Sequence, residues 1–308
     1  MKSEHFIWFI FYLMLSSNLS ANQAQKMSAN QVSIAIETIS NSLVDVYVNP
    51  NKGALAVDSL KTKMNRGSFR DGADFHWFKN EVYNALRMTT GDNSFELIHN
   101  TFAIELISKH NDETAVKSQI SSDGVGYIEL KGSFAFGVNR ELIASHISGL
   151  PTPSALILDL RTVDEGSIEL SQTMLGYFID LDQAIGLLQT NKGIEPIYAI
   201  QTPEFERFSD HIPLYILTSS FVSGPWELFI HALQESGRAV IIGEETMGLA
   251  SIETLIQISE HITLSLTSGM LMSVKERISW HEQGVVPDHF SSSEKALDIA
   301  LSLISERQ

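Results

Sequence analysis

The residues best placed for chemistry lie in a strand, a turn and a helix around Ser223. The apolar run Leu214–Leu217 has the length and composition of a short buried strand, and a stretch of small residues follows it. Pro225 suits the first position of a helix, where a missing N–H costs little. Because the N-terminus of a helix favours negative charge, such a turn is a common place to present a nucleophile. Ser223 is the candidate nucleophile of this turn, or else a helix-capping serine.

Charged side chains supply further candidates, each with two interpretations. Glu227 falls in the first turn of the predicted helix, where a carboxylate serves a reaction or complements the helix dipole. Asp164 and Glu165 are adjacent carboxylates, which form either an acid–base pair or a solvated polar turn. Arg161 follows an apolar run, and its charge fits a substrate clamp or an ion pair at a strand end.

Metal and cofactor sites are not predicted. His281-Glu282 lacks a second histidine four residues after the first, and His289 is eight residues away. The sequence contains no glycine-rich phosphate-binding string. We therefore expect no metal and no cofactor.

The elements around these candidates alternate between strands and helices. The run Ala155–Leu160 is nearly continuous in apolar residues, as in a strand buried on both faces. This alternation predicts an α/β core with substantial parallel pairing. Strands are predicted at 125–136, 155–160, 214–217, 239–242 and within 252–271, and helices at 139–148, 168–178, 226–235 and 293–304. The segment 180–211 has no clear pattern apart from a possible strand at 197–200.

The first third of the chain has a helical pattern. Apolar residues recur at helical spacing in 32–48, 54–64 and 75–88, and Asp74 is a candidate cap for the third helix. We expect a small N-terminal helical domain at residues 28–94, followed by the α/β core at 95–308.

Composition limits the partners. The chain is 44 % hydrophobic and 19 % charged, with a formal net charge of −16, which argues against nucleic acid and anionic membrane surfaces as partners. The absence of cysteine excludes disulfides and thiolate chemistry.

Residues 1–21 have the features of a secretory signal peptide. An apolar stretch, Phe6–Leu15, is followed by small residues before a cleavage point near Ala21. The stretch is too short to favour a spanning helix, although an uncleaved anchor is the alternative, and no later run reaches membrane length. Together with the lack of cysteine, this predicts an exported protein, periplasmic or extracellular, of bacterial type.

Five strings in order resemble the S41 family of serine peptidases, which includes the tail-specific, or C-terminal processing, proteases. The strings are GVGYIELKG (124–132), ALILDLR (155–161) with YFID (177–180), PLYILTSS (213–220), ALQESGRAVIIGEETMG (232–248) and GVVPDH with EKALDIAL (284–301). The helical region ending at TGDNSFEL (90–97) resembles the interphotoreceptor retinoid-binding-protein-like branch. The resemblance implies a ClpP/crotonase-like core of ββα units and peptide-bond hydrolysis by a serine, a base and a backbone oxyanion hole.

The chain departs from the family pattern at the nucleophile. The family's serine lies three residues before a glutamate, and alignment on Glu227 places Gly224 at that position. Ser223 is one residue too early, so it can serve only if the turn is rebuilt.

The base and the oxyanion turn depart as well. The lysine of the processing proteases has no counterpart in 246–250, and the histidine of the retinoid-binding-protein-like branch is replaced by Ser94. Of the oxyanion glycines only Gly166 remains, beside the acidic Asp164 and Glu165. A carboxylate near a developing oxyanion costs on the order of a few kcal/mol at intermediate dielectric.

The sequence therefore predicts a non-catalytic member of the family. Its expected role is to bind a peptide or protein chain, or an apolar small ligand, in a cleft lined by Arg161, Glu165, Gly166 and Glu227. The alternatives are an active serine peptidase with a rearranged turn around Ser223, or a structural partner in the cell envelope.

Overall fold

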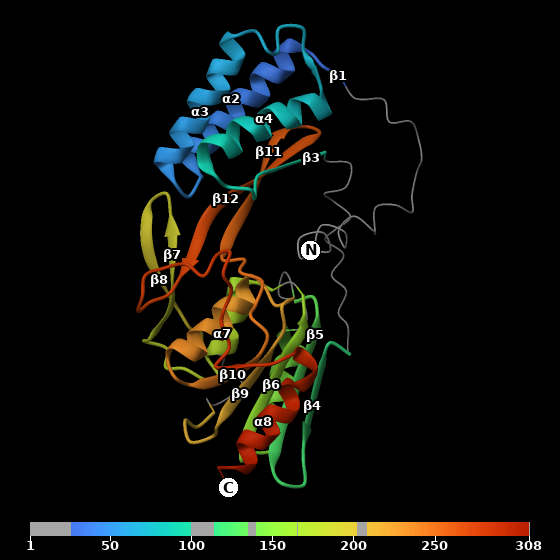
Figure 1. Cartoon of the computed structure of the whole chain (residues 1–308), viewed down its shortest axis with the longest axis vertical. Coiled ribbons are helices and arrows are strands. Elements are labelled where there is room, and N and C mark those ends of the chain that lie inside the picture. The colour runs from blue at the N-terminus through green and yellow to red at the C-terminus, as the bar shows by residue number, and fades with distance from the viewer. Residues whose placement is uncertain (1–25, 100–113, 135–139, 165, 202–207, 308) are drawn as a thin grey trace.

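The computed structural model describes residues 26–99, 114–134, 140–164, 166–201 and 208–307. The chain is elongated, with a helical unit at one end and an α/β unit at the other (Figure 1). The predicted leader 1–21 and Glu165 lie outside the described residues. No helix in the described ranges combines the length and the apolar character needed to cross a bilayer.

Three helices form the N-terminal unit: α2 (Ala29–Asp45), α3 (Pro50–Asn65) and α4 (Phe75–Thr90). Each begins at a polar cap, since Ser28, Asn49 and Asp74 accept hydrogen bonds from backbone N–H groups of the first turns. The second helix begins earlier than its apolar pattern predicts, because a proline is tolerated at the first helical position. Short strands β1 (Lys26–Met27) and β2 (Ala73–Asp74) pair beside these helices.

The α/β unit is built on a six-stranded sheet in the order β13-β10-β9-β6-β5-β4. All neighbouring pairs are parallel except β4 with β5. The strands are β4 (Val116–Ile120), β5 (Val125–Gly132), β6 (Ala155–Val163), β9 (Leu214–Thr218), β10 (Ala239–Gly243) and β13 (His289–Phe290).

Helices cover both faces of this sheet, as the continuous apolar strands require. Along β6, Leu156, Leu158 and Leu160 pack with the helices on one face, whereas Ala155 and Ile157 pack under the C-terminal helix on the other. This alternation follows from the two-residue period of a strand. The helices are α5 (Arg140–Ser148), α6 (Ile168–Leu175) and α7 (Pro225–Glu235) on the first face, and α8 (Ala296–Ser305), preceded by the 3₁₀ turn η4 (Ser293–Lys295), on the second.

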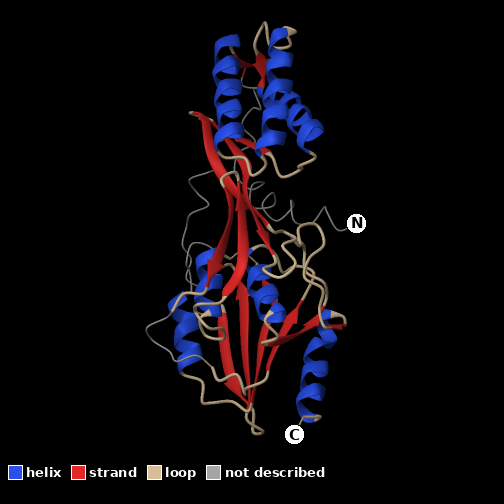
Figure 2. Ribbon diagram, turned by 90° about the vertical axis from the view of Figure 1, so that its left-hand side faces the viewer, coloured by secondary structure: helices blue, strands red, loops and turns tan. Residues whose placement is uncertain are grey.

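A second sheet extends from the α/β unit to the helices (Figure 2). Its order is β11-β12-β7-β8, and β3 pairs with the far end of β12. The strands are β3 (Glu96–His99), β7 (Ala184–Thr190), β8 (Gly193–Tyr198), β11 (Ser251–Ser259) and β12 (Ile262–Met272). The hairpin of β7 and β8 occupies the segment 180–211 that the sequence pattern left without clear elements, and β8 begins before the predicted 197–200 strand.

The end of the β11–β12 hairpin belongs to the core of the helical unit. Ile258, Ile262, Leu264 and Leu266 are buried in one cluster with residues of the three helices. Midway along β12, the backbone N–H of Val48 donates to the Thr267 carbonyl at 2.9 Å. The two units therefore share one hairpin, and the proposed division at residue 95 stays a prediction.

Candidate functional site

Three parallel strands, β6, β9 and β10, end side by side, and the loops that follow them form the candidate site. Thr218 at the end of β9 pairs with Gly243 at the end of β10. Parallel strands in the same sheet present their carboxyl ends at one edge, which is where α/β proteins bind ligands. The described parts of these loops are residues 164, 166–167, 219–224 and 244–250.

Gly224 is the residue that precedes α7, and its backbone has φ 60° and ψ −128°. A positive φ of this kind strongly favours glycine. A Cβ at this position would nevertheless meet no atom closer than the Leu249 carbonyl oxygen, at 3.9 Å. The turn that the family motif assigns to a nucleophile has space for a side chain, but here it carries none.

Glu227 holds this turn in place from the first turn of α7. Its carboxylate is fully buried and accepts four hydrogen bonds. The donors are the backbone N–H groups of Gly224 (2.9 Å), Gly248 (2.7 Å) and Leu249 (2.7 Å) and the hydroxyl of Thr246 (2.5 Å). The side chain thereby joins the loop before α7 to the loop after β10.

The protonation state of Glu227 follows from these partners. Burial raises the pKa of the Glu227 carboxyl, and the four hydrogen bonds act in the opposite direction. The Thr246 hydroxyl accepts from the N–H of Val285 at 2.7 Å, so its single proton is directed to Glu227. Because all four neighbours are donors, the ionised carboxylate is the form that satisfies each of them.

Ser223 lies beside Gly224 and is partly exposed. Within the described residues its hydroxyl has no hydrogen-bond partner, and no histidine or lysine side chain bonds to Ser223 or Gly224. The helix is not capped by Ser223, because Gly224 holds the cap position. The next exposed side chain along the loop is Phe221, which is 66 % exposed.

Arg161 is occupied by an ion pair at the end of β6. Its guanidinium donates to both oxygens of Asp159, at 2.9 and 2.5 Å, and to the Ser293 carbonyl at 2.5 Å. The hydrogen bond with Asp159 raises the pKa of Arg161 further, and the Tyr127 hydroxyl donates to the same carboxylate at 2.6 Å. This geometry joins β5, β6 and the start of the C-terminal helix.

The loop after β6 packs against an indole ring. A Cβ on Gly166 would lie 3.0 Å from Nε1 of Trp226, which is 1 % exposed and packs edge-on against Phe134. Burial raises the pKa of Asp164 in the same loop, and Glu165 lies outside the described residues.

Ser94 sits in a separate polar cluster at the boundary of the helical unit. Its hydroxyl lies 2.7 Å from Asp92 Oδ1 and 2.5 Å from the Thr267 hydroxyl. Asp92 Oδ2 also accepts from Tyr47 (3.1 Å) and Thr267 (2.9 Å). Ser251, which directly follows the 246–250 loop, pairs with Met270 of β12. Thr267 lies three residues before Met270 on the same strand, so about 10 Å of strand separates the Ser94 cluster from that loop.

The cluster around Asp92 could not be predicted from local patterns. Tyr47 and Thr267 are 45 and 175 residues from Asp92 in sequence, and neither stands in a motif. The four donors around Glu227 could not be predicted from the sequence either. The exception is the N–H of Gly224, because a glutamate three residues after the cap position commonly accepts from the N–H of the cap residue. Among the described residues, no group of three or more acidic or histidine side chains is arranged to hold a metal ion.

Comparison of the sequence with known proteins identifies the family to which this chain is similar. Residues 124–290 match the family model of peptidase family S41. The chain is 25 % identical over 149 residues to a carboxyl-terminal-processing protease of Picosynechococcus, covering 48 % of this chain and 34 % of that protein. It is 27 % identical over 175 residues to the carboxy-terminal processing protease CtpA of Bacillus subtilis, covering 56 % and 36 %. The chain thus spans about a third of the length of these curated relatives.

Solved structures show the same fold over most of the chain. A photosystem II D1 C-terminal processing protease superposes with a TM-score of 0.67 at 12 % identity, covering 86 % of this chain and 94 % of that one. A lipoprotein from Streptococcus agalactiae gives a TM-score of 0.62 at 15 % identity, covering 96 % and 100 %. The α/β unit is a ClpP/crotonase-like core, as the resemblance implied. The chain belongs to peptidase family S41.

Replacement of Glu227 tests its role in shaping the turn. In Glu227→Gln the side-chain amide places N–H groups against backbone donors, so at least one buried donor loses its acceptor. We expect the free energy of unfolding to fall by about 2 to 4 kcal/mol, measured by urea denaturation. The matched control is Glu169→Gln, a first-turn acid of α6 that is 71 % exposed, for which we expect a change below about 0.5 kcal/mol. Equal effects of the two substitutions would contradict the assigned role.

Proposed function

We propose that this protein is a non-catalytic S41 member that binds a polypeptide segment at the carboxyl edge of its parallel sheet. The observation that carries the proposal is the turn at Gly224: the residue that aligns with the family's nucleophile precedes helix α7 with a positive φ and has no functional group. Three backbone N–H groups of this region are already bonded to Glu227. A turn held by these bonds, with glycine in place of a nucleophile, supports a role in binding and not in cleavage.

The surroundings of the turn support the loss of hydrolysis. A serine attacks a carbonyl only when a base takes its proton within hydrogen-bond reach. Ser94, at the family's histidine position, instead bonds to Asp92 and Thr267. Arg161 is held by Asp159 and Ser293, so its donors are not directed at a substrate. The indole of Trp226 packs directly against Gly166, the remaining glycine of the oxyanion string.

A polypeptide is the ligand class favoured by the family and by one exposed side chain. Members of the family bind peptide chains as substrates, and loss of the nucleophile removes cleavage without removing contact surfaces. Phe221, in the loop that carries the turn, exposes most of its ring to solvent. Aromatic side chains of this kind are common anchors in polypeptide recognition. We further propose that the chain belongs with the retinoid-binding-protein-like branch, because Asp92 of its D-x-H string is retained.

A second candidate is a serine peptidase that uses Ser223. The partial exposure of Ser223, and its lack of a hydrogen-bond partner among the described residues, favour this candidate. It requires a base that the described contacts do not supply. Binding without cleavage and hydrolysis through Ser223 can be distinguished by experiment.

Labelling with a fluorophosphonate probe tests the absence of a nucleophile. We expect no labelling of the wild-type protein and none of Gly224→Ser, because a serine at 224 still has no base. The Gly224→Ser protein should fold, with a cost of about 1 to 3 kcal/mol for its positive φ, since the space for a Cβ exists. Gly224→Ala controls for that cost. Labelling of the wild type that disappears in Ser223→Ala would instead establish the peptidase.

Binding of an unstructured protein tests the proposed role directly. We expect immobilised protein to bind β-casein and release it intact, as read by interferometry and gel electrophoresis. Phe221→Asp should weaken binding by about tenfold or more, since loss of an aromatic anchor costs upward of ~1.4 kcal/mol. Leu255→Asp is the matched control, because Leu255 is similarly exposed at 64 % but lies on β11. Absence of binding, or equal effects of the two substitutions, would count against this role.

We also propose that the protein is exported, on the strength of the apolar leader segment Phe6–Leu15. Expression of the full chain in a bacterial host should place the protein outside the cytoplasm. Terminal sequencing should find a mature chain that begins close to Asn22. A cytoplasmic protein that retains Met1 would contradict export.

A further inference from the structure

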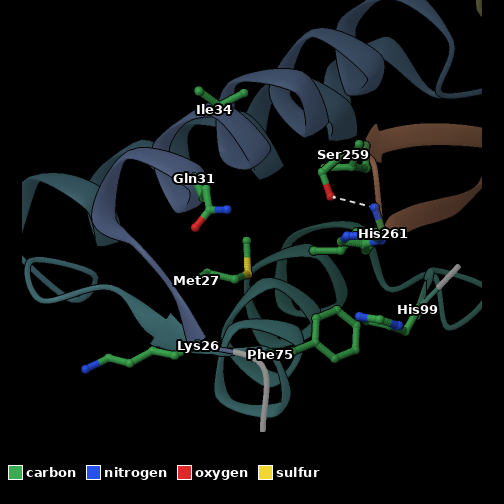
Figure 3. A pocket seen from close by; sticks show the side chains of 10 residues that line it. Lys26, Met27, Gln31, Ile34, Phe75, His99, Ser259 and His261 are labelled. Carbon is green, nitrogen blue, oxygen red and sulfur yellow. Dashed lines mark hydrogen bonds between the residues drawn. The ribbon is translucent and has the colours of Figure 1, made fainter. Parts of the chain in front are cut away.

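A pocket of about 230 Å³ lies between the helical unit and the turn of the β11–β12 hairpin, at the end of the hairpin that is distant from Gly224 (Figure 3). Its buried lining is apolar. Met27, Ile258 and Ile262 are each less than 9 % exposed and belong to the core of the helical unit. Phe75, at the start of α4, adds an aromatic ring, and Ile34 of α2 forms a more exposed part of the wall.

Gln31 supplies hydrogen-bond donors to this apolar pocket. Its side-chain oxygen accepts from the backbone N–H of Ser28 at 2.9 Å and from the Ser28 hydroxyl at 3.0 Å. The capping contact therefore fixes which end of the amide faces the helix terminus. Figure 3 shows the amide nitrogen directed toward Ser259 and His261. Two N–H groups are presented on the pocket side.

Two histidine rings form the opposite side. The rings of His99 and His261 are stacked with centroids 5.9 Å apart and an interplanar angle of 15°. Phe75 meets His99 edge-on at 5.5 Å, which fixes the position of that ring. An imidazole carries at least one N–H in either protonation state. The ammonium group of Lys26 points away from these rings in Figure 3.

The charge of the lining differs from that of the protein. The chain has a formal net charge of −16, yet no described residue that lines the pocket is acidic. Within the described part of the chain, His261 Nε2 pairs with the carboxylate of Glu260 at 3.9 Å, and the side chain of Glu260 is 89 % exposed and does not line the pocket. Solvent therefore screens its charge. The pocket therefore has hydrogen-bond donors on one side and an apolar floor. These features suit a ligand in which a hydrogen-bond acceptor is attached to an apolar group.

We propose that this pocket binds a small apolar monocarboxylate. The apolar body lies against Met27, Ile258 and Ile262, and the carboxylate accepts hydrogen bonds from the Gln31 amide and the His261 ring. The volume is below that of pockets for drug-sized ligands, so the ligand is correspondingly small. This site is separate from the Gly224 turn, and the proposal does not depend on the proposed function.

Calorimetric titration of the full chain with octanoate tests the proposal, with 1-octanol as a probe of similar length without the charge. We expect saturable binding of octanoate and binding of 1-octanol weaker by about tenfold or more, because hydrogen bonds to a charged acceptor are the stronger ones. Equal binding of both probes, or no binding of octanoate, would overturn it. A parallel titration with 4-phenylbutyrate tests the contribution of Phe75: tighter binding than that of octanoate would support the class and extend it to carboxylates with an aromatic body.

Opposite charges at one position give the sharper test. Ile34 is 51 % exposed on the pocket wall, so both Ile34→Glu and Ile34→Lys should fold. We expect octanoate to bind at least about tenfold more weakly to Ile34→Glu than to Ile34→Lys, since a like charge repels the carboxylate. Val44→Glu and Val44→Lys are matched controls on the same helix, because Val44 is 57 % exposed and does not line the pocket. Indistinguishable Ile34 variants would rule out a carboxylate at this site.

Discussion

The buried carboxylate of Glu227 is the interaction on which the rest of the α/β unit's site depends. An ionised group with no access to water is strongly unfavourable unless it is fully hydrogen-bonded. Here four donors converge on its two oxygens, from the turn before α7 and from the loop after β10. Through Thr246 the same carboxylate influences the position of Val285 in the segment that leads to β13. Three stretches of chain that are distant in sequence are thereby fixed relative to one another.

This arrangement explains how the turn at Gly224 is held in place by a residue of the helix that follows it. The N–H of Gly224 donates to Glu227, and the positive φ of this residue favours the glycine that stands there. In the same way the Asp159–Arg161 pair serves strand ends and the C-terminal helix whether or not a reaction takes place nearby.

The sequence predicted the parts of this structure that arise from local patterns. The strand at Leu214, the helix that begins at Pro225 and the cap at Asp74 are confirmed, because periodicity, proline and capping residues act over a few positions. The β7–β8 hairpin was missed, since its exposed second strand has almost no apolar alternation. The partners of Ser94 and Glu227 could not be identified either, because contacts across 173 or 21 residues leave no trace in spacing. The S41 resemblance carried the fold prediction beyond what periodicity alone allowed.

The β11–β12 hairpin has a consequence for how the molecule can come apart. At one end the backbone N–H of Leu271 bonds to Ala250, next to the loop that holds Glu227, and at the other Ile262 and Leu264 are interior residues of the helical unit. Excision of the helices would strip these side chains of their cover and leave a bare apolar hairpin projecting into water. Loss of the hairpin would in turn open the interior of the helices. Neither unit is a free-standing module, and recombination that exchanged one without the other would have to rebuild the shared strands.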